Sequence, residues 1–265
     1  FGGSNSEKLG TDSKMNDFLI TQGVAPNQVS EILNGLPTYW GDQPIVAAPA
    51  YIGVIIFFLA VLALFSDTRK IKYAFLVGAV FSLMLSWGKN FPLLTDLFID
   101  YLPLYNKFRA VSSIQVLLEL CMPVLAVMGL QSFFDLDKTK QWKNLWQSGA
   151  ITLGILALLF LSKGMFSFAG GSDAYLTEAY GYAFTDALKQ DRKSMYTSDL
   201  LRSMFFVLLV GGVLWAFTQE KIKKEYAIIA VGLIMVFDMF SVAKRYVDSN
   251  DFVQASYVDE PFQKD

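Results

Sequence analysis

The chain has 265 residues, of which 54% are hydrophobic, and its formal net charge is −2. Its apolar residues form long runs rather than recurring every 2 or 3.6 positions, which is typical of a membrane protein. The small net charge argues against binding to nucleic acid, and the absence of histidine excludes a Ser-His-Asp triad and an imidazole general base.

The N-terminal part, residues 1–44, is predicted to lie outside the membrane and to contain a short helix. In the segment "APNQVSEILNGLP", Pro26 can begin a helix, and Gly35 followed by Pro37 can end it. Apolar residues recur on one face of this segment.

Six runs approach the length of about 20 apolar residues that a transmembrane helix needs. The runs cover residues 45–66, 71–88, 111–134, 145–162, 200–218 and 226–243. Three short loops between them each carry three basic residues, namely Arg69, Lys70 and Lys72, then Lys138, Lys140 and Lys143, then Lys221, Lys223 and Lys224. The positive-inside rule therefore places these loops in the cytoplasm.

The remaining segments are then extracytoplasmic: residues 1–44, 89–110 and 163–199, and the tail after 244. The predicted fold class is all-α, a polytopic bundle over 45–247 with short extracytoplasmic helices, followed by the start of an extracytoplasmic C-terminal region at 248–265. Within the second outer loop, "FPLLTDLFIDYL" is amphipathic. It predicts a helix that either lies in the outer membrane interface or packs against other extracytoplasmic protein. The stretch "SFAGGSD" at 167–173 is interpreted as a flexible turn.

Two acidic residues, Glu119 and Asp238, fall inside apolar runs, in the outer half of the predicted membrane. Because charge in hydrocarbon costs about 2.5–3.5 kcal/mol on insertion scales, we expect both to face protein or water. Helical spacing places Glu119 on one stripe with Gln115 and Arg109, and a second stripe joins Ser82, Ser86 and Lys89. The stripes either enclose a polar cleft or serve close helix packing.

A polar and aromatic cluster precedes the first apolar run. Trp40 is followed by Asp42 and Gln43 in "YWGDQP". The pattern is typical of aromatic rings that anchor the chain at the membrane interface, and the alternative is that these residues contact a lipid headgroup or sugar.

Several segments in order, "LPTYWGDQPIVAAPAYIGVIIFFLAVLAL", "WGKNFP", "LPLYNKFRAVSS" and "YTSDLLRS", resemble the YfhO family of bacterial membrane proteins. The resemblance covers a middle-to-late portion of that larger family. It implies a glycosyltransferase C-like enzyme of the bacterial cytoplasmic (inner) membrane. Such an enzyme transfers sugar from a polyprenyl-phosphate carrier to a cell-envelope glycan or glycopolymer acceptor on the extracytoplasmic side.

The resemblance also implies that this chain is a fragment whose catalytic acid lies in an earlier loop, so no catalytic residue is assigned. A lipid-linked saccharide flippase and a noncatalytic scaffold for envelope assembly remain the alternatives. A divalent cation is compatible with the available carboxylates, but no ligand spacing identifies a metal site.

The basic residues Lys89, Lys107 and Arg109 stand on the outer side, against the usual charge bias. We interpret them as ligands of the carrier phosphate, for which the planar fork of Arg109 is best suited. The alternative is snorkelling to lipid headgroups, or pairing with Asp96 or Asp100.

Overall fold

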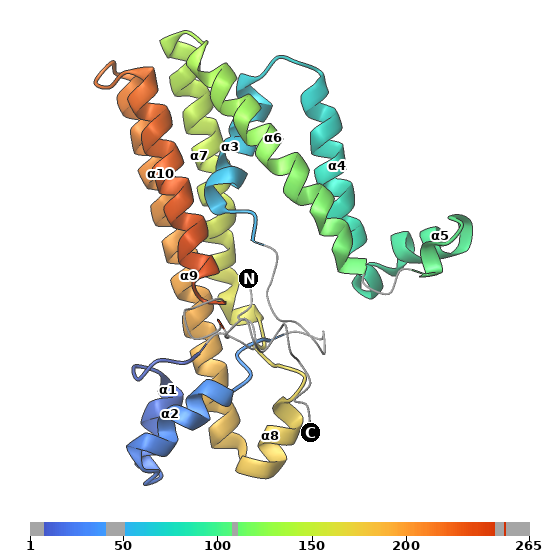
Figure 1. Ribbon diagram of the computed structural model, residues 1–265, viewed down its shortest axis with the longest axis vertical. Coiled ribbons are helices and arrows are strands. Elements are labelled where there is room, and N and C mark those ends of the chain that lie inside the picture. The colour runs from blue at the N-terminus through green and yellow to red at the C-terminus, as the bar shows by residue number, and fades with distance from the viewer. Residues whose placement is uncertain (1–7, 41–50, 108–110, 247–251, 253–265) are drawn as a thin grey trace, which may run out of the picture. The chain divides into compact units, whose positions relative to one another are not determined.

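A computed structural model of the chain describes residues 8–40, 51–107, 111–246 and 252, and these residues form helices and loops without a strand (Figure 1). The α-helices are α1 (Lys14–Thr21), α2 (Pro26–Gly35), α3 (Val54–Ser66), α4 (Ile71–Ser86), α5 (Pro92–Tyr101), α6 (Gln115–Phe134), α7 (Lys138–Leu161), α8 (Asp173–Tyr180), α9 (Tyr182–Thr218) and α10 (Lys224–Ala243). Short 3₁₀ helices are η1 (Gly88–Asn90), η2 (Tyr105–Lys107), η3 (Val111–Ile114) and η4 (Ser162–Met165).

The described residues divide into two compact units. Unit 1 takes its residues from Phe1–Pro49, Ser162–Asp199 and Met239–Asp265, and unit 2 from Ala50–Leu161 and Leu200–Asp238. Unit 1 therefore combines three of the segments predicted to be extracytoplasmic. Unit 2 holds most of the apolar helices, together with α5.

Four described helices, α6, α7, α9 and α10, are long and apolar enough to cross a membrane. The other two predicted spans correspond to α3 and α4, which are apolar but shorter, and part of the first predicted span lies outside the described residues. Two helices extend beyond the predicted spans: α7 begins at Lys138 and α9 at Tyr182. The reason in α9 is that the polar residues before position 200 include no glycine or proline to end a helix.

In unit 2, α6 packs along α3 and α4, and α7 packs against α3 (Figure 1). Most of α3 is buried, including Phe58 and Leu62. The backbone of α6 approaches that of α3 very closely at Gly129. A Cβ atom there would lie 2.5 Å from the carbonyl oxygen of Leu59 and 2.7 Å from the backbone nitrogen of Ala63. Glycine thus allows the two helices to cross with their backbones nearly in contact.

The three basic turns are the connections that carry Arg69–Lys72, Lys138–Lys143 and Lys221–Lys224. They lie at one end of unit 2 and are joined by polar contacts. Asp67 in the first turn accepts a hydrogen bond of 2.9 Å from Ser132, which lies near the end of α6, just before the second turn. Between the second and third turns, Lys138 and Glu220 form an ion pair of 2.7 Å. Lys72 is buried, and its ammonium donates to the backbone carbonyls of Leu64 and Asp67 at the end of α3. This charge therefore stabilises a helix C-terminus.

Unit 1 has a small apolar core between α1, α2, α8 and the first part of α9. The core comprises Met15, Leu19, Val29, Leu33, Leu36, Leu176, Phe184, Ala187 and Leu188. The predicted helix at "APNQVSEILNGLP" is confirmed as α2, with Pro26 at its first position. α1 is held by α9, because the Asp191 carboxylate accepts hydrogen bonds from the backbone N–H groups of Lys14 and Met15 at 2.7 and 2.8 Å.

Substitution of Gly129 by alanine is expected to destabilise unit 2 by about 1–3 kcal/mol, since the added methyl group meets backbone atoms that cannot move independently. The lone Cys121 is buried, so its reaction with a thiol-reactive dye on heating in detergent reports unfolding. Gly149→Ala on α7 is the matched control, because no heavy atom lies within 4 Å of its added Cβ. Equal unfolding temperatures for the two variants would contradict the close crossing.

Hydrogen bonds from the Arg69 side chain, reinforced by Ser132, hold the pKa of the Asp67 carboxyl below its ordinary value. Because the folded pKa lies below the unfolded value of about 3.9, this stabilisation is complete above that value and is lost as pH falls through the folded pKa. Asp67→Asn should therefore reduce stability at pH 7 and weaken the acid dependence of unfolding followed by circular dichroism. Glu225→Gln, at an exposed carboxylate, is the control. An acid dependence in Asp67→Asn that matches wild type would refute the assignment.

Candidate functional site

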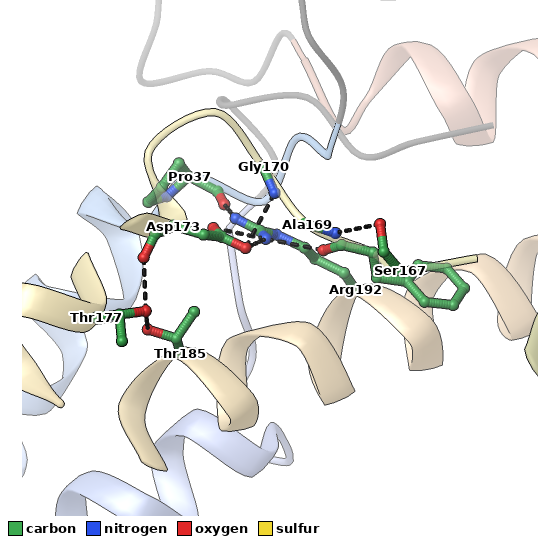
Figure 2. A network of polar contacts seen from close by, with 9 residues as sticks. Pro37, Ser167, Ala169, Gly170, Asp173, Thr177, Thr185 and Arg192 are labelled. Atoms are coloured by element: carbon green, nitrogen blue, oxygen red, sulfur yellow. Dashed lines mark hydrogen bonds and ion pairs between the residues drawn. The ribbon is translucent and has the colours of Figure 1, made fainter. Parts of the chain in front are cut away.

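A buried ion pair organises the polar part of unit 1, as Figure 2 shows. The Arg192 side chain of α9 is fully buried, and its Nη1 lies 2.8 Å from Oδ2 of Asp173, the first residue of α8. Nη1 also donates to the carbonyl of Phe168 over 2.9 Å, and Nη2 donates to the carbonyl of Pro37 over 2.7 Å. The guanidinium therefore connects three separate segments of the chain.

The loop at 166–172 is shaped around this guanidinium. Phe168 has a φ of 50°, a left-handed conformation that is uncommon for a phenylalanine, and its carbonyl is held by Arg192. A Cβ at Gly170 would lie 2.9 Å from Nη2 of Arg192 (Figure 2). The backbone N–H of Gly170 donates to Asp173. The segment predicted to be a flexible turn is thus closely fitted to the ion pair.

Trp40 belongs to an aromatic cluster in the same unit. Its ring centroid lies 4.7 Å from that of Phe168 and 6.1 Å from those of Phe166 and Tyr196. Tyr196 and Phe168 are buried, whereas Trp40 and Phe166 are partly exposed. The predicted neighbours Asp42 and Gln43 lie outside the described residues. The structure therefore shows a packed and partly accessible aromatic surface at Trp40.

A second polar cluster lies within unit 2, around Asp238 of α10. Asp238 is fully buried, and Arg202 of α9 reaches its Oδ1 over 3.2 Å. The hydroxyl of Tyr51 donates to Asp238 over 2.9 Å and accepts from Arg202 over 3.1 Å. Asp238 thus faces protein, and its carboxylate holds together α9, α10 and Tyr51, which lies three residues before the start of α3.

The two predicted polar stripes have different surroundings. Ser82 and Ser86 of α4 are buried, and their hydroxyls donate to carbonyls of their own helix, those of Ala79 and Leu83. This arrangement is typical of small residues that allow helices to pack closely. On α6, Gln115 is partly exposed and Glu119 is exposed. The serines therefore support the packing alternative, and a cleft lined by Glu119 stays a prediction.

The predicted phosphate ligands flank α5 in the sequence. Lys107 is exposed at the end of η2. Lys89 lies in η1, but its side chain is outside the described part of the chain, as is the whole of Arg109. The convergence of these three cations therefore stays a prediction from the sequence.

The predicted helix at "FPLLTDLFIDYL" is confirmed as α5, and its apolar side chains are largely uncovered. Leu93 is 78% exposed, Tyr101 81% and, just after the helix, Leu104 71%, whereas Thr95 is the buried residue of α5. Such exposure is costly in water and agrees with either alternative, a helix that lies in the membrane interface or one that packs against other protein. The segment Pro92–Lys107 thus presents apolar side chains that end at an exposed cation.

Sequence reasoning did not identify the partners of the buried charges. Arg202 was detectable, because α9 and α10 are antiparallel and joined by a short turn, so residues at similar distances from that turn lie opposite each other. By this reasoning Arg202 and Asp238 form a pair. Arg192 and Asp191 gave no such signal, since their partners in 37–40, 168–173 and the start of α1 are fixed by tertiary structure.

These helices define an all-helical protein with several segments suited to a membrane. Comparison with family models, curated proteins and solved structures gives no match to this chain. The resemblance to the YfhO family therefore rests on the quoted sequence segments alone.

Replacing Arg192 by glutamine should destabilise unit 1 by about 3–5 kcal/mol, because the buried Asp173 carboxylate loses its compensating charge. Lys193→Gln is the matched control, since Lys193 is the next residue and is exposed. Limited proteolysis should cleave the 166–172 loop faster in Arg192→Gln than in Lys193→Gln. Equal cleavage rates would show that the ion pair does not hold this loop.

Proposed function

We propose that this chain is part of an integral membrane glycosyltransferase that takes sugar from a polyprenyl-phosphate carrier and transfers it to a cell-envelope acceptor outside the bacterial cytoplasmic membrane. In this proposal α3, α4, α6, α7, α9 and α10 provide six spans, and the three basic turns face the cytoplasm. The four long apolar helices and the position of all three turns at one end of unit 2 support that topology.

One observation carries the proposal: the segment Pro92–Lys107 joins exposed apolar side chains to an exposed cation, between two apolar helices of unit 2. A polyprenyl phosphate has the matching chemistry, because its chain is apolar and its phosphate is anionic. The apolar face of α5 would lie against the prenyl chain, and Lys107 would approach the phosphate. Lys89 and Arg109 are close in sequence and would complete the cationic environment.

The required chemistry divides between a base and a cationic site. Inverting transfer needs a carboxylate that deprotonates the acceptor hydroxyl and cations that stabilise the phosphate as it leaves. In this proposal the cations are Lys107 of the segment described above and its sequence neighbours Lys89 and Arg109. Asp238 is engaged with Arg202 and Tyr51, and no residue is assigned as the base.

The test is a transfer assay on the full-length protein in liposomes with a polyprenyl-phosphate sugar labelled in the sugar. Transfer predicts that label leaves the carrier and joins the acceptor. Movement of intact labelled carrier between leaflets without release would overturn the enzyme proposal in favour of a flippase. Retention of the label on an unmoved carrier would favour a scaffold.

Lys107→Gln is expected to weaken carrier binding about fivefold, the usual effect of one basic residue near an anionic lipid surface. Arg109→Lys keeps the charge, removes the bidentate fork and should also weaken binding. Lys193→Gln, at an exposed site on α9, is the control. Carrier affinity should be measured at equal membrane insertion. Unchanged affinity in both test variants would contradict the assigned phosphate site.

A further inference from the structure

A basic pocket lies at the end of unit 2 where the turns before α7 and α10 meet. It has a volume of about 600 Å³ and is lined by residues of two segments, Leu136–Lys138 with Gln141, and Phe217–Thr218 with Glu220–Lys223. The segments are tied together across the pocket by the ion pair between Lys138 and Glu220. A second ion pair, of 3.4 Å, joins Lys224 to Asp135 beside it. The pocket is thus built by side chains from two separate helical hairpins.

The acidic residues that line the pocket are neutralised within the fold. Glu220 is paired with Lys138, and Asp137 lies 2.8 Å from Lys140 and also accepts a hydrogen bond from the backbone of α7. Lys221 and Lys223 are exposed, and no ion pair joins either to a carboxylate of the described residues. The first turn of α10, which begins at Lys224, adds the partial positive charge of a helix N-terminus. The pocket therefore has an excess of positive charge.

An apolar groove continues from this pocket along α9 and α10. It has a volume of about 520 Å³ and is lined by Leu208, Leu209, Gly212, Val213, Ala216, Ile222, Tyr226 and Ala230. Ile222 lines both the groove and the basic pocket. From Ala216 to Leu208 the groove follows α9 for about 12 Å, at 1.5 Å per residue. This length is close to the hydrocarbon depth of one leaflet, about 15 Å.

Two further features place the junction of pocket and groove at a membrane surface. The Lys221 ammonium lies 4.7 Å from the centre of the Trp215 ring, and Tyr226 is exposed at the start of α10. Tryptophan, tyrosine and lysine are the residues that anchor helices at the level of lipid headgroups. The polar pocket therefore lies at headgroup level, and the groove runs into hydrocarbon.

We propose that the basic pocket and the apolar groove together form a binding site for an anionic glycerophospholipid. The lipid phosphate lies between Lys221 and Lys223, and one acyl chain lies along the groove past Gly212. This site is separate from the proposed carrier site and does not depend on the proposed enzymatic function. Charge complementarity selects the headgroup, while the continuity at Ile222 requires an occupant with a polar and an apolar part.

The test uses the full-length protein in detergent, titrated with phosphatidylglycerol that carries brominated acyl chains. Bromine quenches nearby tryptophan fluorescence, and Trp215 lies beside the site. Phosphatidylcholine with the same brominated chains tests the contribution of the acyl chains. Soluble glycerol phosphate tests the contribution of the headgroup. Specific binding predicts saturable quenching by phosphatidylglycerol at concentrations at least tenfold below those needed for phosphatidylcholine, and weak competition by glycerol phosphate.

Two sets of variants, each with a matched control, locate the site. Lys221→Gln and Lys223→Gln should each weaken phosphatidylglycerol binding about fivefold, whereas Lys143→Gln, at an exposed lysine near the same end but outside the pocket, should not. Gly212→Leu should block the acyl chain. Gly211→Leu should not, since Gly211 does not line the groove and neither glycine has an atom within 4 Å of an added Cβ.

Three results would overturn the proposal. Equal affinity for phosphatidylcholine would remove the role of the lysines, and glycerol phosphate binding as tight as that of the lipid would indicate a free phosphate site. A dimer that Gly212→Leu dissociates and that excludes brominated lipid would show that a second copy of the chain fills the groove. Native mass spectrometry of the same samples distinguishes a bound lipid from a bound second copy.

Discussion

An ionised side chain among apolar helices must be compensated, and this constraint accounts for the polar cluster around Asp238 in unit 2. Asp238 is buried only because Arg202 and the hydroxyl of Tyr51 approach it. The compensation fixes the register of α10 against α9, since sliding either helix by one turn would separate the charges by about 5.4 Å. A charge that is expensive to bury therefore specifies both which helices are neighbours and their relative position along the helix axis. The surrounding apolar side chains restrict that position less strictly.

The basic residues at the opposite end of these helices are used in a different way. Lys72 binds helix carbonyls, Arg69 binds Asp67, and Lys138 joins two turns, so several of the charges that predict topology also stabilise local structure. Only those charges left without such contacts are available to an external anion. The number of basic residues in the sequence therefore overestimates the charge that a lipid or ligand meets. Lys221 and Lys223 are among the exposed lysines that no ion pair joins to a carboxylate of the described residues.

The positions of helices were largely predictable from sequence, because runs of apolar residues are long and the stop signals around α2 are strong. The start of α9 was not, since polar residues such as those around Arg192 are good helix formers and carry no hydropathy signal. The burial cost of Asp238 predicted its need for a compensating environment, but a single charge does not name its partner. The Arg192 network depends on segments distant in sequence, and only the tertiary structure brings them together.

The capping of α1 by Asp191 has a consequence for synthesis at the ribosome. A helix of eight residues has little stability alone, and two of its first backbone N–H groups depend on a carboxylate up to 177 positions later in the chain. Residues 14–21 therefore leave the ribosome long before their partner exists, and most of unit 2 is translated in between. During that interval the N-terminal segment is an open substrate for proteases and chaperones, so its survival depends on how quickly translation reaches α9.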